Sequence, residues 1–240
     1  MSNDRRLLRA AGIEKSYRGR ARPTLAATTL EVFPGELIAV VGHNGAGKST
    51  LFELLGGLMR PDRGRVEQTV EAGDIGWCPQ REIIDWSLTV RQNVTLGLEM
   101  RKSVPRATLR NHFDELADAL HLSEYADRTA ETLSGGELRR TQIARAMIGS
   151  PTLMILDEPT TGLDPAGIRI VFDYLERRRA QGASALISTH ETSRFATYCT
   201  RVVALRDGLA IADESIARFT ARAGGSEDLW DAYEGLGGDA

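Results

Sequence analysis

The length, composition and charge of the chain describe a folded globular protein. It has 240 residues, of which 42% are hydrophobic and 26% are charged, so it can bury one sizeable core and is too apolar for a disordered protein. With 30 Lys plus Arg against 33 Asp plus Glu, the formal net charge is −3, which excludes a general attraction to nucleic acid.

The first half of the chain predicts strands around one unit of strand, loop and helix. Residues 36–41 contain the apolar run Leu-Ile-Ala-Val-Val, which is typical of a strand buried on both faces. The glycine-rich residues 42–47 follow it, and residues 48–58 carry leucines at helical spacing. Composition and flanking turns predict further strands at residues 7–17, 28–33, 65–71 and 74–78.

In the second half, predicted strands and helices alternate. Apolar residues recur among charges over residues 90–130, which predicts a helical insertion. A helix over residues 137–148 begins at two glycines, and a buried strand over residues 153–156 ends in two carboxylates. The pattern then predicts a helix at 165–179, a strand at 183–189, and a hairpin formed by 202–206 and 209–212. This alternation indicates an α/β fold whose central strands are parallel.

Two interpretations stay open for the C-terminal residues 224–240. This segment carries five acidic side chains and no basic one, which is typical of a frayed acidic tail. Within it, however, four apolar or aromatic residues lie at helical spacing, which favours a short docked helix. They are Leu229, Trp230, Tyr233 and Leu236.

Cysteine usage and hydropathy predict a cytoplasmic protein. Cys78 and Cys199 have no CxxC partner, which argues against a disulfide framework or a zinc site and predicts two core residues. No apolar run approaches the roughly 20 residues of a membrane helix. Residues 1–9 lack the apolar stretch of a secretory signal. We therefore expect a chain that does not cross a bilayer by itself.

The glycine-rich stretch carries a phosphate-binding motif. Between the buried strand and the helix, the pattern G-x-x-x-x-G-K-[ST] is matched by Gly42-His43-Asn44-Gly45-Ala46-Gly47-Lys48-Ser49-Thr50. Glycines let the backbone wrap closely around a phosphate chain, and the helix N-terminus adds positive potential. The motif predicts that Lys48 reaches the β and γ phosphates of a nucleotide and that Ser49 holds Mg²⁺.

Two adjacent carboxylates, Asp157 and Glu158, end the second buried strand. At the end of a strand, both side chains can reach a site formed by the loops. Because a phosphate-binding motif lies upstream, we expect Asp157 to hold the Mg²⁺ shell. We expect Glu158 to polarise an attacking water.

A third motif distinguishes this chain from other phosphate-loop proteins. Leu133-Ser134-Gly135-Gly136-Glu137 closely resembles the signature sequence of the ATP-binding cassette (ABC) ATPases. The rest of that family's pattern follows in the family's order over residues 17–190. Its members are Tyr17, which resembles the aromatic residue that stacks on adenine, Gln80 of the Q-loop, Gly162-Leu163-Asp164 of the D-loop, and His190, the switch histidine.

The resemblance implies a P-loop NTPase fold with a RecA-like core, an antiparallel β subdomain and a helical signature subdomain. The ATPase domain would occupy residues 1–223 and its helical subdomain about residues 81–150. ATP and Mg²⁺ are the implied cofactors, Glu158 and His190 the catalytic residues. The implied metal ligands are Ser49, Gln80 and Asp157. The implied ATP-binding residues are Tyr17, Gly42, His43, Asn44, Gly45, Ala46, Gly47, Lys48, Ser49, Thr50, Gln80, Ser134, Gly135, Gly136 and Asp164.

The resemblance also implies partners. In the family, the signature of one chain faces the phosphate loop of a second, so we expect a head-to-tail dimer that holds two ATP molecules. Because both half-sites are intact in this chain, a homodimer is expected, with a heterodimer as the alternative. A separate polytopic membrane subunit would place the chain on the cytoplasmic face of the cell membrane, and the short C-terminal segment favours export over import. The alternative is a soluble ABC ATPase acting on nucleic acid or ribosomes, which the net charge of −3 disfavours.

A few positions depart from the family's commonest pattern or extend it. His43 stands where proline is frequent, at a position that needs only to let the loop curve. Glu137 replaces the usual glutamine, and we expect its carboxylate to point away from phosphate and to favour the first turn of the following helix. Residues 82–86 bring apolar side chains to the place where the family's membrane subunits dock, although internal packing is the alternative.

Overall fold

Six strands form the central sheet, in the order β5-β6-β7-β3-β8-β9. Our computed structural model describes residues 6–19, 22–100, 105–189, 195–222 and 228–236. All neighbouring pairs are parallel except β8 and β9, which form an antiparallel hairpin, so the predicted α/β fold is confirmed. The strands are β3 (Leu37–Val41), β5 (Ile75–Cys78), β6 (Leu153–Leu156), β7 (Ser184–Ser188), β8 (Arg201–Arg206) and β9 (Leu209–Ser215).

Strand β3 lies between two hydrophobic cores, and all of its residues are fully buried. Leu37, Ala39 and Val41 belong to the core on the side of helices α4 (Gly135–Met147) and α5 (Pro165–Ala180). Ile38 and Val40 belong to the core that also contains helix α1 (Lys48–Leu55) and the second sheet. Because successive side chains of a strand point to opposite faces, one short apolar run contributes to both cores.

The second sheet is antiparallel, in the order β2-β1-β4, and it is the β subdomain that the family resemblance implied. Its strands are β1 (Leu8–Lys15), β2 (Leu25–Val32) and β4 (Arg63–Gln68). Strand β2 begins three residues earlier than predicted, because Leu25 pairs with Lys15 and buries its side chain completely.

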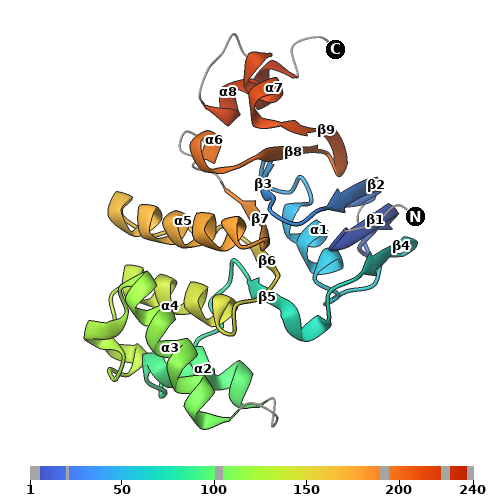
Figure 1. Cartoon of the computed structure of the whole chain (residues 1–240). Coiled ribbons are helices and arrows are strands. Elements are labelled where there is room, and N and C mark those ends of the chain that lie inside the picture. Colours follow the sequence, from blue (N-terminus) through green and yellow to red (C-terminus); the bar gives the residue numbers. More distant parts are fainter. Residues whose placement is uncertain (1–5, 20–21, 101–104, 190–194, 223–227, 237–240) are drawn as a thin grey trace.

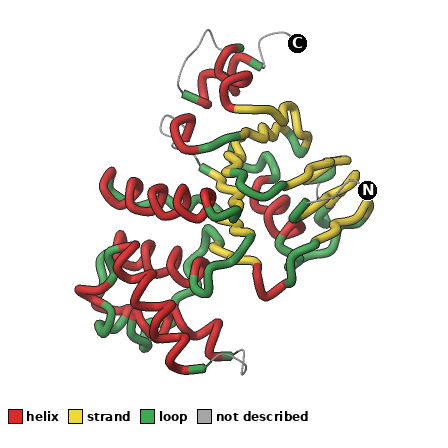
Figure 2. The backbone as a smooth tube through the Cα atoms, viewed as in Figure 1, coloured by secondary structure: helices red, strands yellow, loops and turns green. Residues whose placement is uncertain are grey.

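The longer helices fall into two groups. Helices α2 (Val90–Glu99), α3 (Arg106–Leu120) and α4 (Gly135–Met147) lie together at one end of the molecule (Figure 1), away from the strands of the second sheet (Figure 2). They occupy the predicted helical segment. Helices α1 (Lys48–Leu55) and α5 (Pro165–Ala180) follow β3 and β6.

Shorter helical segments complete the described chain. They are α6 (Phe195–Tyr198), α7 (Ile216–Ala221), α8 (Leu229–Gly235) and the 3₁₀ turns Ala72–Asp74, Ser123–Tyr125 and Ala130–Thr132. Helix α1 ends three residues before its predicted end, because Gly56 and Gly57 follow it and Gly57 adopts a left-handed φ of +72°.

Helix α8 decides between the two interpretations of the acidic C-terminal segment for residues 229–235. Leu229, Ala232 and Tyr233 are buried in the core, so the docked helix is correct there and the frayed tail is wrong. Residues 224–227 and 237–240 lie outside the described part of the chain.

The two cysteines lie where the sequence predicts them. Cys78 and Cys199 are both buried and free, which confirms them as core residues. Burial raises the pKa of the Cys78 thiol to about 11 and that of Cys199 well above its usual value. Within the described ranges, none of the helices has the length and apolar character needed to span a bilayer.

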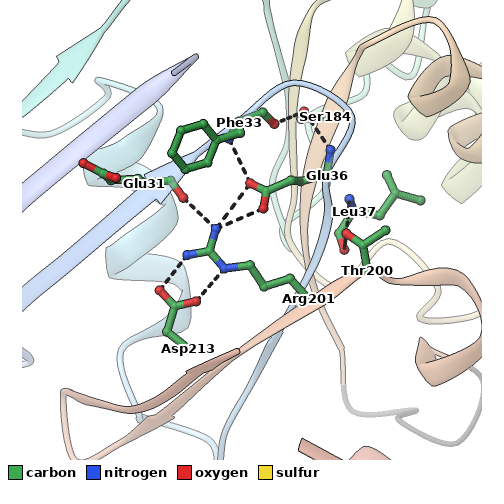
Figure 3. A network of polar contacts seen from close by, with 8 residues as sticks. All are labelled: Glu31, Phe33, Glu36, Leu37, Ser184, Thr200, Arg201 and Asp213. Atoms are coloured by element: carbon green, nitrogen blue, oxygen red, sulfur yellow. Dashed lines mark hydrogen bonds and ion pairs between the residues drawn. The ribbon is translucent and has the colours of Figure 1, made fainter. Parts of the chain in front are cut away.

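Arg201 on β8 joins the main sheet to the turn between β2 and β3 (Figure 3). Its guanidinium forms a paired contact with Asp213 on β9, with Nε and Nη2 lying 2.5 and 2.6 Å from the two carboxylate oxygens. Its Nη1 donates to the carbonyl of Glu31 at 2.9 Å and to the carboxylate of Glu36 at 3.2 Å. One largely buried charge thus holds three segments of the chain together.

We predict that Arg201→Ala lowers the free energy of unfolding by about 2 kcal/mol, because two carboxylates lose their partner in a largely buried place. The matched control is Arg179→Ala, which removes a more exposed pair with Glu176 and should cost less than about 0.5 kcal/mol. Urea unfolding monitored by circular dichroism measures both. Equal losses for the two variants would contradict the structural role of Arg201.

Candidate nucleotide-binding site

A cavity of about 340 Å³ opens where strands β3, β5 and β6 end. Ligand sites of parallel sheets lie at this edge, because the carboxyl ends of the strands meet there. The cavity brings together the phosphate-binding motif, the Q-loop glutamine and the second carboxylate after β6. Its lining residues are Tyr17, Thr24, Asn44, Gly45, Gly47, Lys48, Ser49, Thr50, Glu53, Gln80 and Glu158.

The loop between β3 and α1 has no room for side chains at two of its glycines. A Cβ on Gly42 would lie 2.4 Å from the carbonyl oxygen of Leu205, and one on Gly47 would lie 2.6 Å from that of Thr24. Gly47 is also the N-cap of α1 and offers no side chain to the first N–H groups of that helix. These N–H groups can therefore bind an anion at the cavity.

Lys48 places a buried positive charge beside this loop. Its side chain is 6% exposed, and Nζ donates to the carbonyl oxygens of Gly42 at 2.6 Å and His43 at 3.1 Å. Burial lowers the pKa of Lys48 from its usual value, while the charges of Glu158 and Asp157 oppose this shift. The two carboxylates therefore help to keep the amine protonated.

Asp157 and Glu158 are both buried, and Ser188 at the end of β7 contacts both residues. The Ser188 hydroxyl donates to Asp157 Oδ1 at 2.5 Å and accepts from the Glu158 N–H at 2.8 Å. Gln80 Nε2 donates to Glu158 Oε2 at 3.0 Å, so the Q-loop and the carboxylate lie side by side.

Glu158 has a left-handed backbone, with φ of +49°. A residue with a side chain adopts this conformation at a cost on the order of 1 kcal/mol, so the surroundings must hold it there. Ser188 binds its N–H, and Arg139 Nη2 donates to its carbonyl at 2.6 Å. The backbone of Glu158 is thus fixed from both β7 and α4.

Arg139 and Gln142 connect α4 to the ends of β5 and β6. The guanidinium of Arg139 also donates to the carbonyls of Pro79, Asp157 and Pro159. Gln142 Nε2 donates to the carbonyls of Pro79 and Arg81, on either side of Gln80, at 2.8 Å each. Sequence reasoning missed these two residues and Ser188. The sequence offered a signal only for the position of Ser188, a polar residue at the end of a strand in which every residue is buried.

The signature residues lie outside the cavity. Ser134 is the N-cap of α4 and forms a reciprocal capping box with Glu137, whose carboxylate accepts from the Ser134 N–H at 2.8 Å. This hydrogen bond lowers the pKa of Glu137. A Cβ on Gly136 would lie 3.6 Å from the carbonyl of Gly162, so the signature and the D-loop are neighbours. Asp164 caps α5 by accepting from the Gly167 N–H at 2.7 Å.

The remaining predicted residues differ in what the structure says of them. Tyr17 lies at the mouth of the cavity, 38% exposed, with its hydroxyl 3.4 Å from Thr50 Oγ1. His43 turns away from the cavity toward α8. His190 lies outside the described residues.

The oxygen donors at the site fit Mg²⁺ bound with phosphates. Ser49, Gln80 and Asp157 would supply a hydroxyl, an amide oxygen and a carboxylate. Within the part of the chain that the structure describes, no group of three or more His, Cys, Asp or Glu residues forms a metal cage. Mg²⁺ typically takes one or two carboxylates together with phosphate and water oxygens, which such a donor set allows.

Comparisons with known proteins agree with this geometry. The family model described as "ABC transporter" matches residues 25–161, more than half of the chain. A lipopolysaccharide export system ATP-binding protein of Haemophilus influenzae is 32% identical over 219 residues, which cover 86% of this chain and 89% of that protein. An energy-coupling factor transporter ATP-binding protein of Bacillus licheniformis is 35% identical over 226 residues, covering 88% of this chain and 79% of that protein.

Two solved structures give the same result. One, an ATP-binding subunit of an ABC transporter, superposes with a TM-score of 0.86 at 26% identity, covering 96% of this chain and 99% of the other. Another, a dimeric bacterial ABC transporter cassette, superposes with a TM-score of 0.79 at 25% identity, covering 87% of this chain and 98% of the other.

We predict that Ser188→Ala lowers kcat for ATP hydrolysis about tenfold and changes the KM for ATP less than twofold, because Ser188 orients the groups that flank the reaction without lining the cavity. The matched control is Ser184→Ala. Ser184 lies on the same strand, is equally buried and also makes two hydrogen bonds, to Phe33 and Glu36. Both variants should lose about 1 kcal/mol of stability. A similar loss of kcat in both would show that Ser188 has no special role.

Proposed function

Since this chain belongs to the ABC transporter family, in which it is an ATP-hydrolysing subunit, we propose that it works as a head-to-tail homodimer. The dimer binds two ATP molecules with Mg²⁺ and couples their hydrolysis to the movement of a substrate through separate membrane subunits, in the direction of export.

One observation carries this proposal: some of the predicted ATP-binding residues line the cavity, and others lie on the surface away from it. The cavity holds the phosphate loop, Gln80 and Glu158, whereas Ser134 and Asp164 are exposed and do not line it. A second copy, turned head to tail, can bring its signature to the open side of the cavity. The dimeric cassette among the similar structures supports this arrangement.

Each side chain at the cavity then has a role. Tyr17 stacks on the adenine, while Lys48 and the N–H groups of the loop bind the phosphates. Ser49, Gln80 and Asp157 would hold Mg²⁺, which would offset negative charge on the phosphate oxygens. Glu158 accepts a hydrogen bond from the attacking water and orients it toward the γ-phosphate, and its bond from Gln80 holds the carboxylate in place. His190 would assist at the γ-phosphate.

The membrane partner is proposed to dock beside the Q-loop. Trp86 is 48% exposed, and Ile83 and Ile84 are half-buried, so this segment offers apolar surface. Arg145 on α4 donates to the carbonyl of Ile83 at 2.6 Å, which ties the docking segment to the helix that contacts Glu158. This contact would place the chain on the cytoplasmic face of the membrane. The lipopolysaccharide export relative supports export as the direction.

We predict that ATP with Mg²⁺ converts Glu158→Gln protein from monomer to dimer, because ATP is bound and cannot be hydrolysed. Light scattering after size-exclusion chromatography measures the mass. Adding Ser134→Arg should abolish the dimer by placing a long side chain at the signature. A Glu158→Gln protein that stays monomeric at saturating ATP would contradict the head-to-tail proposal.

We predict that Trp86→Ala separates the chain from its membrane partner. Tagged Glu158→Gln protein is purified from detergent-solubilised native membranes, and the proteins that accompany it are identified by mass spectrometry. We expect a polytopic membrane protein in stoichiometric amount. Adding Trp86→Ala should reduce the recovery of that protein at least about tenfold. Transport should fall with it, while basal hydrolysis persists because Trp86 lies outside the cavity. Recovery of ribosomes or DNA instead would favour a soluble ATPase.

A further inference from the structure

Helix α8 contacts the phosphate-binding loop, and none of the roles given above uses this contact. His43 is the point of contact. Its ring meets the rings of Trp230 and Tyr233 edge to face, with centroids 4.9 and 5.2 Å apart. Its Nε2 lies 3.1 Å from the carboxylate of Glu234. The side chain of His43 therefore binds α8, while its neighbours in the loop line the cavity.

Helix α8 is itself firmly held against the end of β8. Tyr233 is fully buried, and its hydroxyl donates to the carbonyl of Leu205 at 3.0 Å. Arg206 Nη2 donates to the carbonyl of Tyr233 at 2.8 Å, and its guanidinium lies over the Tyr233 ring. Leu229 is also fully buried in the core. The helix thus offers His43 a fixed support.

A fixed support can reduce the entropic cost of ordering the loop. Gly42, Gly45 and Gly47 all have positive φ, and glycines lose the most conformational freedom when they become ordered. Ordering the loop before the nucleotide arrives removes that cost from binding. Proline, which is frequent at this position in the family, stiffens a loop by fixing its own φ. His43 has no such ring constraint, and its contacts to α8 can supply the stiffness instead.

We propose that α8 positions the phosphate-binding loop through His43, so that docking of α8 and binding of ATP stabilise each other. This inference rests on the proposed role of residues 42–50 in binding ATP. Coupling between two sites is reciprocal, so any factor by which α8 tightens ATP binding is also the factor by which ATP tightens the docking of α8. The C-terminal helix would then adjust nucleotide affinity without lining the site.

The first test measures ATP affinity by isothermal titration calorimetry without Mg²⁺, so that no hydrolysis interferes. Trp230→Ala should weaken ATP binding about fivefold, because the larger of the two ring partners is lost. Trp230→Phe keeps an aromatic ring and should stay within twofold of the parent chain. Glu234→Gln should also stay within twofold, since an exposed ion pair contributes little.

The second test separates positioning from general stability. In a His43→Pro background, Trp230→Ala should leave ATP affinity unchanged, because the loop no longer depends on α8. Hydrogen exchange of the α8 amides, followed by mass spectrometry, should slow when ATP is added to the parent chain and not to His43→Pro. If Trp230 only stabilised the fold, Trp230→Ala would weaken ATP binding equally in the parent chain and in the His43→Pro background.

The outcomes distinguish the inference from the proposed function. If the parent chain does not bind ATP, the proposed function fails. If it binds ATP and Trp230→Ala binds equally well although α8 exchanges faster, only the coupling is overturned. If Trp230→Ala does not fold, His43→Ala replaces it, because His43 is exposed and its loss leaves the core intact. That variant should weaken ATP binding and speed exchange in α8, and unchanged values for both would overturn the inference.

Discussion

The burial of β3 on both faces is the constraint on which the rest of the site depends. Two cores fix the strand, and therefore the point at which Gly42 leaves the sheet. From there the loop passes so close to the backbones of Leu205 and Thr24 that only glycine fits at two positions. The strand order β6-β7-β3 then brings the carboxylates, Ser188 and the loop to one edge. The positions of the residues at the site therefore depend on the packing of the sheet as much as on the sequence motifs.

Glu158 is the residue at which the central sheet and the helical region are joined. Its left-handed backbone is held through its N–H by β7 of the sheet and through its carbonyl by Arg139 of the helical region. A rotation of α4 relative to the sheet would pull on this peptide unit before it reached any bound nucleotide. Because α4 also binds the backbone around Gln80, the same rotation would move Gln80 together with Glu158.

Much of this arrangement could be predicted from the sequence because its signals are local. Continuous apolar runs indicate the buried strands, and the motif from Gly42 to Thr50 can be identified from its own residue spacing. The roles of Ser188 and Arg139 could not be predicted, because a serine in a strand or an arginine in a helix gives no indication of the segment it meets. The docking of α8 depended in the same way on a distant partner, the end of β8. The roles of the signature and of His190 stay predictions.

The capping box at Ser134 limits which residues can begin the signature helix. Serine, threonine, aspartate and asparagine all make effective N-caps, because each offers an oxygen to the N–H groups of the first turn. A hydroxyl does this with a single atom, because its oxygen accepts that bond and its own hydrogen can still be donated to something outside the helix. Aspartate would cap equally well but would bring a negative charge toward an anion. At this position one atom, the Ser134 Oγ that accepts from the Glu137 N–H, begins the helix and would also serve the proposed contact with a phosphate.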